Sequence, residues 1–283
     1  MSNTTEAPTI AALMAGAYAL PTLPQVVTHI LETLNDDNAD ADSLVLRLNT
    51  DPAIVARLLA AANSSAFGLS SQVVSTRQAI LVLGLETVRT ITLATALIEH
   101  FGHCTTGFDG RQLWRHSLGV ATCARTIAER ADYNPEAAFS AGLLHDIGQL
   151  LLVAVAPEFC AEVRMRMQLN SESIITAERA VFGYDHAIVG GELARLWHLP
   201  ADIIAGIHAH HDADSGSDGE IGDIVHIAEI LSHALDLGKA ERNHVPEVSE
   251  LAQLRLGIDW LSLAARFPEI EARYEGVRHA LSL

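Results

Sequence analysis

The sequence has few cysteines and few aromatic residues. Its three cysteines, Cys104, Cys123 and Cys160, are widely spaced and form no CxxC pair. This set provides no disulfide framework and suits a reducing environment, so we expect a cytoplasmic protein. Aromatic residues make up 5% of the chain and apolar residues 49%. An apolar set dominated by Ala and Leu favours helix-on-helix packing over a β-sandwich.

Basic residues are also scarce. The 283-residue chain carries 35 acidic against 18 basic side chains, a formal net charge of −17. Nucleic acids and anionic membrane surfaces both attract Lys and Arg, so we expect no nucleic-acid partner and no membrane association. We also find no apolar run near the roughly 20 residues that cross a bilayer. The short apolar stretch 10–20 follows Glu6, where a signal peptide would carry a positive charge.

Helical periodicity dominates from Leu20 onward, and residues 1–19 are predicted to be a loose leader with at most one short helix. Asp51-Pro52 is a helix-start signal, and Gly84 interrupts a later helix. Asp212–Asp223 is the clearest flexible loop. No segment alternates with period two, so the expected fold class is all-α. Helices are predicted around 86–100, 110–131, 135–152, 157–168, 171–182, 185–197, 200–210 and 221–237, with two or three more in 246–283.

Histidine is abundant, with 14 in the chain. His116 shares a helical face with apolar residues three and four positions away, so it is predicted to point toward the core. His145 and Asp146 follow the apolar run Ala141-Gly-Leu-Leu, and a buried carboxylate is costly unless it is paired or bound to a cation. His186, the pair His210-His211 and Glu229 complete an ordered series. Imidazole and carboxylate ligands suit Fe, Mn, Zn or Ni, so we expect one or two divalent transition metals.

Each of these residues alone is a weak signal, because a lone buried His is more often a hydrogen-bonded core residue than a ligand. His226 and His233 flank Glu229 at helical spacing and are left outside the candidate set. Six further histidines are interpreted as surface or core residues: His29, His100, His103, His198, His244 and His279.

The ordered series resembles that of HD-superfamily proteins. Its elements are Trp114-Arg-His-Ser117, Gly142-Leu-Leu-His-Asp-Ile-Gly148, Tyr184-Asp-His-Ala-Ile-Val-Gly190, Ala209-His-His211 and His226-Ile-Ala-Glu-Ile230. The first half of the chain is similar to HDOD domains, the HD-related output domains. Its matching segments are Leu20-Pro-Thr-Leu-Pro24, Asp51-Pro52, Ala62-Asn-Ser-Ser-Ala-Phe-Gly68 and Ala79-Ile-Leu-Val-Leu-Gly84, and Trp197-His-Leu-Pro200 also fits. The resemblance covers about residues 20–240.

This resemblance implies an α-helical HDOD fold and a regulatory role in bacterial signalling. We expect a leader over 1–19, an N-terminal helical lobe over 20–100, an HD-like lobe over 101–240 and a C-terminal helical extension over 241–283. Expected partners are signalling proteins such as sensors or cyclic-dinucleotide enzymes, with a nucleotide or phosphate as a possible ligand.

By resemblance to dinuclear HD-GYP phosphodiesterases, one metal would use His116, His145, Asp146 and Glu229. The second would use Asp146, His186, His210 and His211. Three departures count against catalysis. Gln149 stands where those enzymes carry a Lys, and a neutral amide cannot stabilise a phosphoryl oxyanion by charge. Glu229 replaces an Asp. The acidic segment Asp212–Asp223 lacks a Gly-Tyr-Pro loop and repels phosphate.

Three functions remain open from the sequence: a non-catalytic signalling or interaction module, a metal-dependent phosphohydrolase, and a metal or nucleotide sensor. We favour the first and assign no catalytic residue, except Asp146 if the protein is active. The segment Asn63–Phe67 is interpreted as a helix end with local backbone hydrogen bonds, rather than as a partner contact.

Overall fold

The computed structural model describes residues 7–19, 41–64, 72–101, 108–215, 219–239, 245–281 and 283. Within these ranges the fold is all-α, as predicted, with no strand. The motif Leu20–Pro24 lies outside the described residues. The helices are α1 (Ile10–Ala19), α3 (Ala41–Leu48), α4 (Pro52–Ala62), α5 (Thr76–Phe101), α6 (Gly110–Arg130), α7 (Pro135–Leu144), α8 (Ile147–Val155), α9 (Pro157–Asn170), α10 (Ile174–Phe182), α11 (His186–Leu196), α12 (Ala201–Ala209), α13 (Gly219–Ala234), α14 (Glu250–Arg255), α15 (Trp260–Ala264) and α16 (Phe267–Leu281), with a 3₁₀ turn, η1 (Ala213–Ser215).

Helix α4 begins at the predicted start signal. The Asp51 carboxylate accepts hydrogen bonds from the backbone N–H groups of Ala53, at 2.9 Å, and Ile54, at 3.2 Å, and Pro52 occupies the first helical position. This cap satisfies backbone donors that the helix itself leaves unpaired. Gly84 interrupts α5 with φ 75° and ψ 159°, so α5 consists of two helices that meet at a kink, as the sequence indicates.

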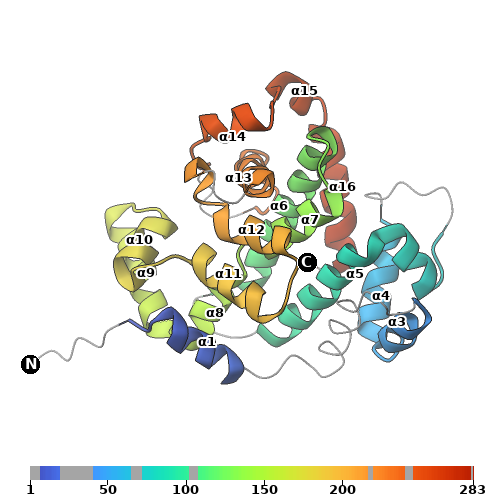
Figure 1. The fold of residues 1–283 in the computed structure, drawn as a ribbon, viewed down its shortest axis with the longest axis horizontal. Helices are drawn as coiled ribbons and strands as arrows, with labels where there is room; N and C mark the ends of the chain where they lie inside the picture. The colour runs from blue at the N-terminus through green and yellow to red at the C-terminus, as the bar shows by residue number, and fades with distance from the viewer. Residues whose placement is uncertain are drawn as a thin grey trace, which may run out of the picture.

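Helix α1 belongs to the core. It lies against α8 and α11 (Figure 1), and its Leu13 is fully buried. The Tyr184 hydroxyl donates a hydrogen bond to the backbone carbonyl of Pro8, just before α1. Residues 10–19 thus form the one short helix that the sequence allowed in this segment, and burial of its apolar side chains holds the helix on the fold.

The predicted helix over 135–152 is in fact two helices, α7 and α8, separated at His145-Asp146. The stretch Pro135–Val155 is nevertheless 21 residues long with mean hydropathy 1.6, enough to cross a membrane by length and composition. The expectation that no such run exists was wrong. In the fold, 83% of its most apolar window is buried. The two helices form part of the protein core, with α6 and α12 packed against α7 and with α11 packed against α8.

The predicted loop Asp212–Asp223 is shorter than expected. It contains η1, and α13 already begins at Gly219. Asp223 is 3% exposed and forms a bidentate pair with Arg255 of α14, with both distances 2.6 Å. Part of the predicted acidic loop is therefore the first turn of a buried helix, because the Arg255 guanidinium compensates the charge of Asp223.

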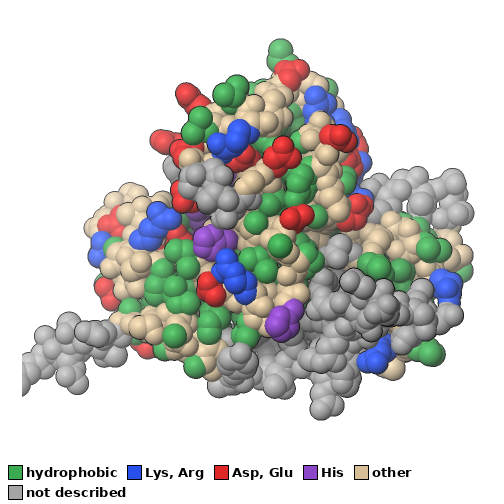
Figure 2. All heavy atoms as spheres, in the orientation of Figure 1, with side chains coloured by type: hydrophobic (Ala, Val, Ile, Leu, Met, Phe, Trp, Pro, Cys, Tyr) green, Lys and Arg blue, Asp and Glu red, His purple; other side chains and the backbone are tan. Residues whose placement is uncertain are grey.

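Three helices, α14, α15 and α16, follow in the C-terminal region, in agreement with the prediction of two or three. Helix α16 packs on both α6 and α4, so the C-terminal region lies against the N-terminal part of the chain (Figure 1). On the face shown in Figure 2, Lys and Arg side chains lie apart from one another among acidic and apolar ones.

Candidate metal centre

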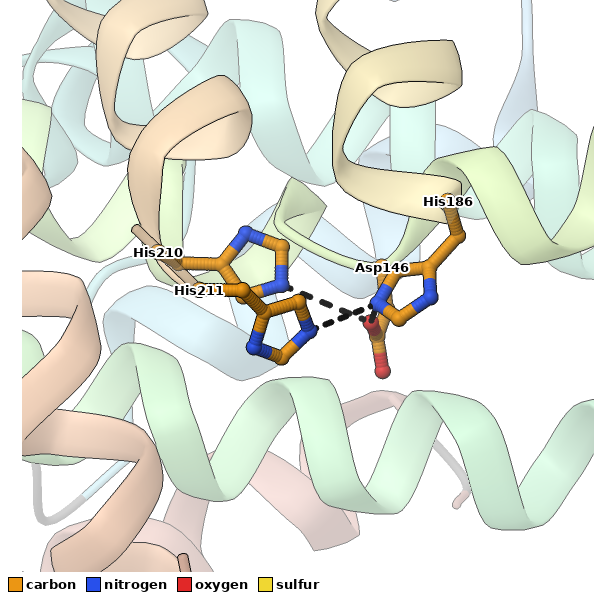
Figure 3. Close-up of side chains that lie close together, drawn as sticks. All are labelled: Asp146, His186, His210 and His211. Atoms are coloured by element: carbon orange, nitrogen blue, oxygen red, sulfur yellow. Dashed lines mark hydrogen bonds and ion pairs between the residues drawn. The ribbon is translucent and has the colours of Figure 1, made fainter. Parts of the chain in front are cut away.

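The predicted site residues come from five places in the fold. His116 lies in α6, His145 and Asp146 form the junction between α7 and α8, and His186 is the first residue of α11. His210 and His211 follow α12, and Glu229 lies in α13. All of these helices converge near the α7–α8 junction, and Figure 3 shows Asp146 between His186 on one side and His210 and His211 on the other.

Close packing at glycines makes this convergence possible. A methyl group added at Gly148 would lie 2.0 Å from the backbone carbonyl oxygen of His186, so only glycine lets α8 approach α11 this closely. At Gly142 an added methyl group would lie 2.8 Å from the Cα of Ala121 in α6. The two glycines that flank His145-Asp146 in the sequence thus bring the neighbouring helices toward it.

Asp146 is the centre of the cluster. Its Oδ1 lies 3.0 Å from His186 Nε2 and 4.0 Å from His210 Nε2. Its Oδ2 lies 3.4 Å from His145 Nε2 and 3.8 Å from His116 Nε2. Although Asp146 occupies the N-cap position of α8, its side chain makes no capping hydrogen bond, so both oxygens face the imidazoles.

Two histidines are held in the tautomer that binds metal. The Nδ1 atoms of His145 and His210 donate to the backbone carbonyls of Gly142, at 2.8 Å, and Ile207, at 2.7 Å. The proton of each neutral ring is therefore on Nδ1, and the Nε2 lone pair points into the cluster. Both Nε2 atoms are buried and have no hydrogen-bond partner. A buried polar atom without a partner is costly, so these two atoms fit the role of cation ligands.

His186 is held differently. Its Nδ1 lies 2.6 Å from Glu178 Oε2, and the same oxygen accepts from the His186 backbone N–H at 2.9 Å. The His186 Nε2 also lies 2.9 Å from His211 Nε2. Burial favours the neutral ring, but Glu178 and Asp146 outweigh it and raise the pKa of His186 well above its usual value. Metal binding at His186 Nε2 would therefore release a proton.

The other titratable groups are shifted mainly by burial. Burial, with His145 nearby, lowers the pKa of His116 to about 3, and burial also lowers the pKa values of His145, His210 and His211. Burial, with the Asp146 charge, raises the pKa of Glu229 to about 8. Burial would raise the pKa of Asp146 too, but the surrounding imidazoles outweigh it and hold that pKa well below its usual range. Four neutral imidazoles around one carboxylate are poised to accept a cation.

The candidate ligands fall into overlapping groups whose ligand atoms all lie within 4.8 Å of one another. One group is Asp146, His186, His210 and His211, the same four residues that the resemblance assigns to one metal. A second is His116, His145 and Asp146. Glu229 differs from expectation, because it groups with His116 and His233 instead of with His145 and Asp146.

Sequence reasoning missed Glu178. It is 4% exposed and orients His186. A signal for it exists, since Glu178 lies four residues from both Ile174 and Phe182 on the apolar stripe of α10. His226, by contrast, is not available as a ligand. Its Nδ1 donates to the His210 carbonyl at 3.0 Å, and its Nε2 accepts from the Ser249 N–H at 3.2 Å.

The remaining histidines are divided by the structure. His279, whose side chain is 76% exposed, lies on the surface as predicted. His198 has a positive φ of 53° just after α11. His29, His103, His244 and Cys104 lie outside the described residues, as does the side chain of His100.

Gln149 lines a small cavity with apolar residues of α8, α9 and α10, next to Glu178.

An all-α fold that gathers imidazoles around one Asp between two core helices defines the class of HD-type helical domains. Residues 20–213 match the model of the HDOD domain. The chain therefore belongs to the HDOD family, as its sequence motifs indicate.

The chain is also similar to solved structures and to curated proteins. A candidate phosphohydrolase from Shewanella amazonensis SB2B is 25% identical, with a TM-score of 0.76 over 96% of this chain and 98% of its own. An HDOD domain protein of unknown function from Geobacter sulfurreducens is 27% identical, with a TM-score of 0.71 over 95% of this chain and 97% of its own. Ribonuclease Y of Mesoplasma florum is 32% identical over 123 residues, which are 44% of this chain and 19% of that protein. The curated relatives are matched over only 15% to 25% of their length.

Proposed function

We propose that this chain is a regulatory HDOD module whose HD-like lobe binds divalent transition metal and acts in signalling through a protein or ligand. The observation that carries the proposal is the pair of buried, unpartnered Nε2 atoms of His145 and His210, both close to the Asp146 carboxylate. Residues 20–100, 101–240 and 241–283 serve as its N-terminal lobe, HD-like lobe and C-terminal extension.

The residues support metal binding in distinct ways. Asp146, His186, His210 and His211 would hold one ion, with Glu178 and the Ile207 carbonyl fixing the orientation of two of the rings. Imidazole with carboxylate favours Fe, Mn, Zn or Ni over Mg or Ca. When bound, such an ion supplies Lewis acidity toward a phosphoryl oxygen.

The signalling role rests on family membership, on the residue that follows the His145–Gly148 motif and on the charge of the chain. Gln149 is a neutral amide where the dinuclear phosphodiesterases carry a cation, and the chain as a whole is strongly acidic. Both features disfavour turnover of an anionic substrate. They favour a module that binds a protein or ligand without converting it. We expect its partners to be signalling proteins such as sensors or cyclic-dinucleotide enzymes.

A metal-dependent phosphohydrolase is the second candidate. It is favoured by the partial exposure of two candidate ligands, since the His116 side chain is 16% exposed and that of Glu229 10%. A substrate phosphoryl group needs such access. Similarity to proteins named for phosphohydrolase or ribonuclease activity points in the same direction.

Elemental analysis combined with activity assays tests both candidates. We expect protein purified without chelator to contain at least one transition metal ion per chain, and Asp146→Ala to contain almost none. Neither protein should hydrolyse phosphomonoesters, nucleotides or cyclic dinucleotides. Metal-dependent turnover by the wild type, lost in Asp146→Ala, would establish the second candidate instead. Wild-type protein that binds none of Fe, Mn, Zn or Ni would refute both.

A further inference from the structure

The third group of candidate ligands lies at the outer end of the cluster. His116, Glu229 and His233 bring ligand atoms within 4.8 Å of one another, and Glu229 is buried whereas the two histidines are half-buried. The rings of His116 and His233 lie 4.8 Å apart, closer than the 5.2 Å between the rings of His116 and His145. His116 therefore has two imidazole neighbours, His145 toward the interior of the cluster and His233 toward its edge.

The helices themselves enforce this arrangement. Glu229 and His233 are four residues apart in α13, so they share one face of that helix. A methyl group added at Gly119 in α6 would lie 2.4 Å from Ser232 Oγ, so α6 and α13 meet at that glycine. His116 is one helical turn before Gly119 and His233 directly follows Ser232. The close contact between the helices thus brings the two imidazoles together.

A second glycine contact fixes the position of His116. At Gly238, in the turn after α13, an added methyl group would lie 3.2 Å from the Cα of His116. The Gln112 side chain, one turn earlier in α6, donates to the Gly238 carbonyl at 2.8 Å. His116 is therefore fixed between α13 and the turn that follows it.

We propose that His116, Glu229 and His233 form a second metal subsite, in which His233 is a ligand that the family resemblance does not assign. This inference rests on the proposed function and extends it. Two imidazoles and one carboxylate are the protein ligands of many catalytic zinc sites and of non-haem Fe(II) sites, and they leave coordination positions open. The group centred on Asp146 offers four protein ligands and is more enclosed.

The two subsites would then differ in their roles. The inner group can satisfy a tetrahedral ion from the protein alone, as structural metal sites do. The outer subsite leaves positions for an external oxygen ligand, and its half-buried histidines lie at the accessible edge. A phosphoryl oxygen is therefore expected to bind at the outer ion. Glu229 connects the two subsites, because its Oε2 also lies 3.7 Å from His211 Nδ1.

Metal titration of the full chain tests this subsite. We expect the metal-free wild type to bind two Co²⁺ or Zn²⁺ ions in two phases, the weaker of which belongs to the outer subsite. His233→Ala should bind one ion, in the tighter phase. His233→Gln, which keeps the size of the side chain better, should lose the weaker phase as well, and it provides the test if the alanine variant does not fold. The surface variant His279→Gln is the matched control and should bind two ions.

Inorganic phosphate provides a second measurement. We expect phosphate to raise the melting temperature of the two-metal wild type and of His279→Gln, but not that of the His233 variants, because binding to the native state alone stabilises it. Two ions bound by a folded His233 variant would overturn the inference and leave the proposed function intact. A wild type with a single phase that His233→Gln leaves unchanged would also overturn it. A wild type that binds no metal would refute the proposed function itself.

Discussion

Helix ends in this protein use polar side chains in two opposite ways. At the end of α4, the Asn63 amide donates to the carbonyls of Leu59 and Val73, both at 2.8 Å, and its oxygen accepts from the Val73 N–H at 2.7 Å. Both its donor and its acceptor groups are used by the backbone. At the ends of α7 and α12, His145 and His210 give only one ring nitrogen to the backbone and keep the other in the cluster.

The difference separates a structural residue from a candidate ligand. Asn63 closes the connection between α4 and the segment before α5, in agreement with its interpretation as a helix end. The imidazoles are oriented by the backbone but not satisfied by it. Hydrogen bonding within the fold explains one ring nitrogen of each histidine. It does not explain the second nitrogen, which is buried, has no hydrogen-bond partner and points toward a carboxylate.

The largest expected effect is that of Gly148→Ala. The added methyl group would collide with the His186 backbone, so α8 and α11 must separate. We expect the free energy of unfolding to fall by about 3 kcal/mol or more and metal binding to be lost. Gly191→Ala in the same helix is the control, since the three atoms nearest its methyl group, the closest at 3.1 Å, all belong to the His208 side chain. Equal urea midpoints for the two variants would contradict the close-packing argument.

Glu178→Gln tests the orientation of His186. The amide keeps the shape of the side chain but removes the negative charge that holds the His186 ring. Loss of an outer hydrogen-bond partner of a metal ligand typically lowers affinity about 10- to 100-fold. We expect that loss in a competition assay with a metal-binding dye. Affinity within a factor of about two of the wild type would show that Glu178 is only a core residue.

Acidification should weaken the metal-free protein through its neutral histidines. The pKa of His116 is lowered to about 3. Its contribution is therefore present above the unfolded-state pKa of about 6.5 and is lost as the pH falls toward 3. His145, His210 and His211 act with the same sign. His186 and Glu229 have the opposite sign, because their pKa values are raised and their contributions are lost as the pH rises.

Between pH 7 and pH 5 the four lowered groups outweigh the two raised ones, so stability should fall with acid. The share of His116 is about 1–2 kcal/mol. Urea unfolding of the metal-free protein at the two pH values measures this, with His116→Gln expected to reduce the difference and His279→Gln to leave it unchanged. A metal-free protein that is more stable at pH 5 than at pH 7 would show that the signs are reversed.

Asn63→Ala should have the smallest effect and the most selective one. Loss of its hydrogen bonds at a partly exposed helix end should cost roughly 1–2 kcal/mol of unfolding free energy. Metal content should not change, because this residue belongs to the N-terminal part of the chain. Chemical denaturation and elemental analysis of the same preparation check both statements. A drop in bound metal would mean that the end of α4 is energetically coupled to the metal cluster.

Much of the fold follows from local signals. Asp51-Pro52 begins α4, Gly84 interrupts α5, and the apolar spacing around His116 gives the buried face of α6. These features depend on residues within one or two helical turns, which sequence patterns describe well. The break at His145-Asp146 was missed because the apolar run continues through it. The burial of Asp223 was missed because its partner, Arg255, is 32 residues away.

In the candidate site, too, local sequence patterns predict some residues and only long-range packing identifies others. Order along the chain was enough to select His116, His145, Asp146, His186, His210, His211 and Glu229. Glu178 and His233 were left out of that set, although both lie on helical faces that point at it. Only the packing distances separate His233, next to His116, from His226, whose two nitrogens are already used.

The sequence by itself determined the helical class, the family and most of the side chains that gather in the core, because periodicity and motif order are properties of the chain. Tertiary structure decided which of those side chains lie together in the cluster. The distances between helices depend on contacts such as Gly148 against His186 and Gly119 against Ser232. Tertiary structure also decided the tautomers of His145 and His210, because a ring nitrogen is committed only when a particular carbonyl lies within hydrogen-bonding distance.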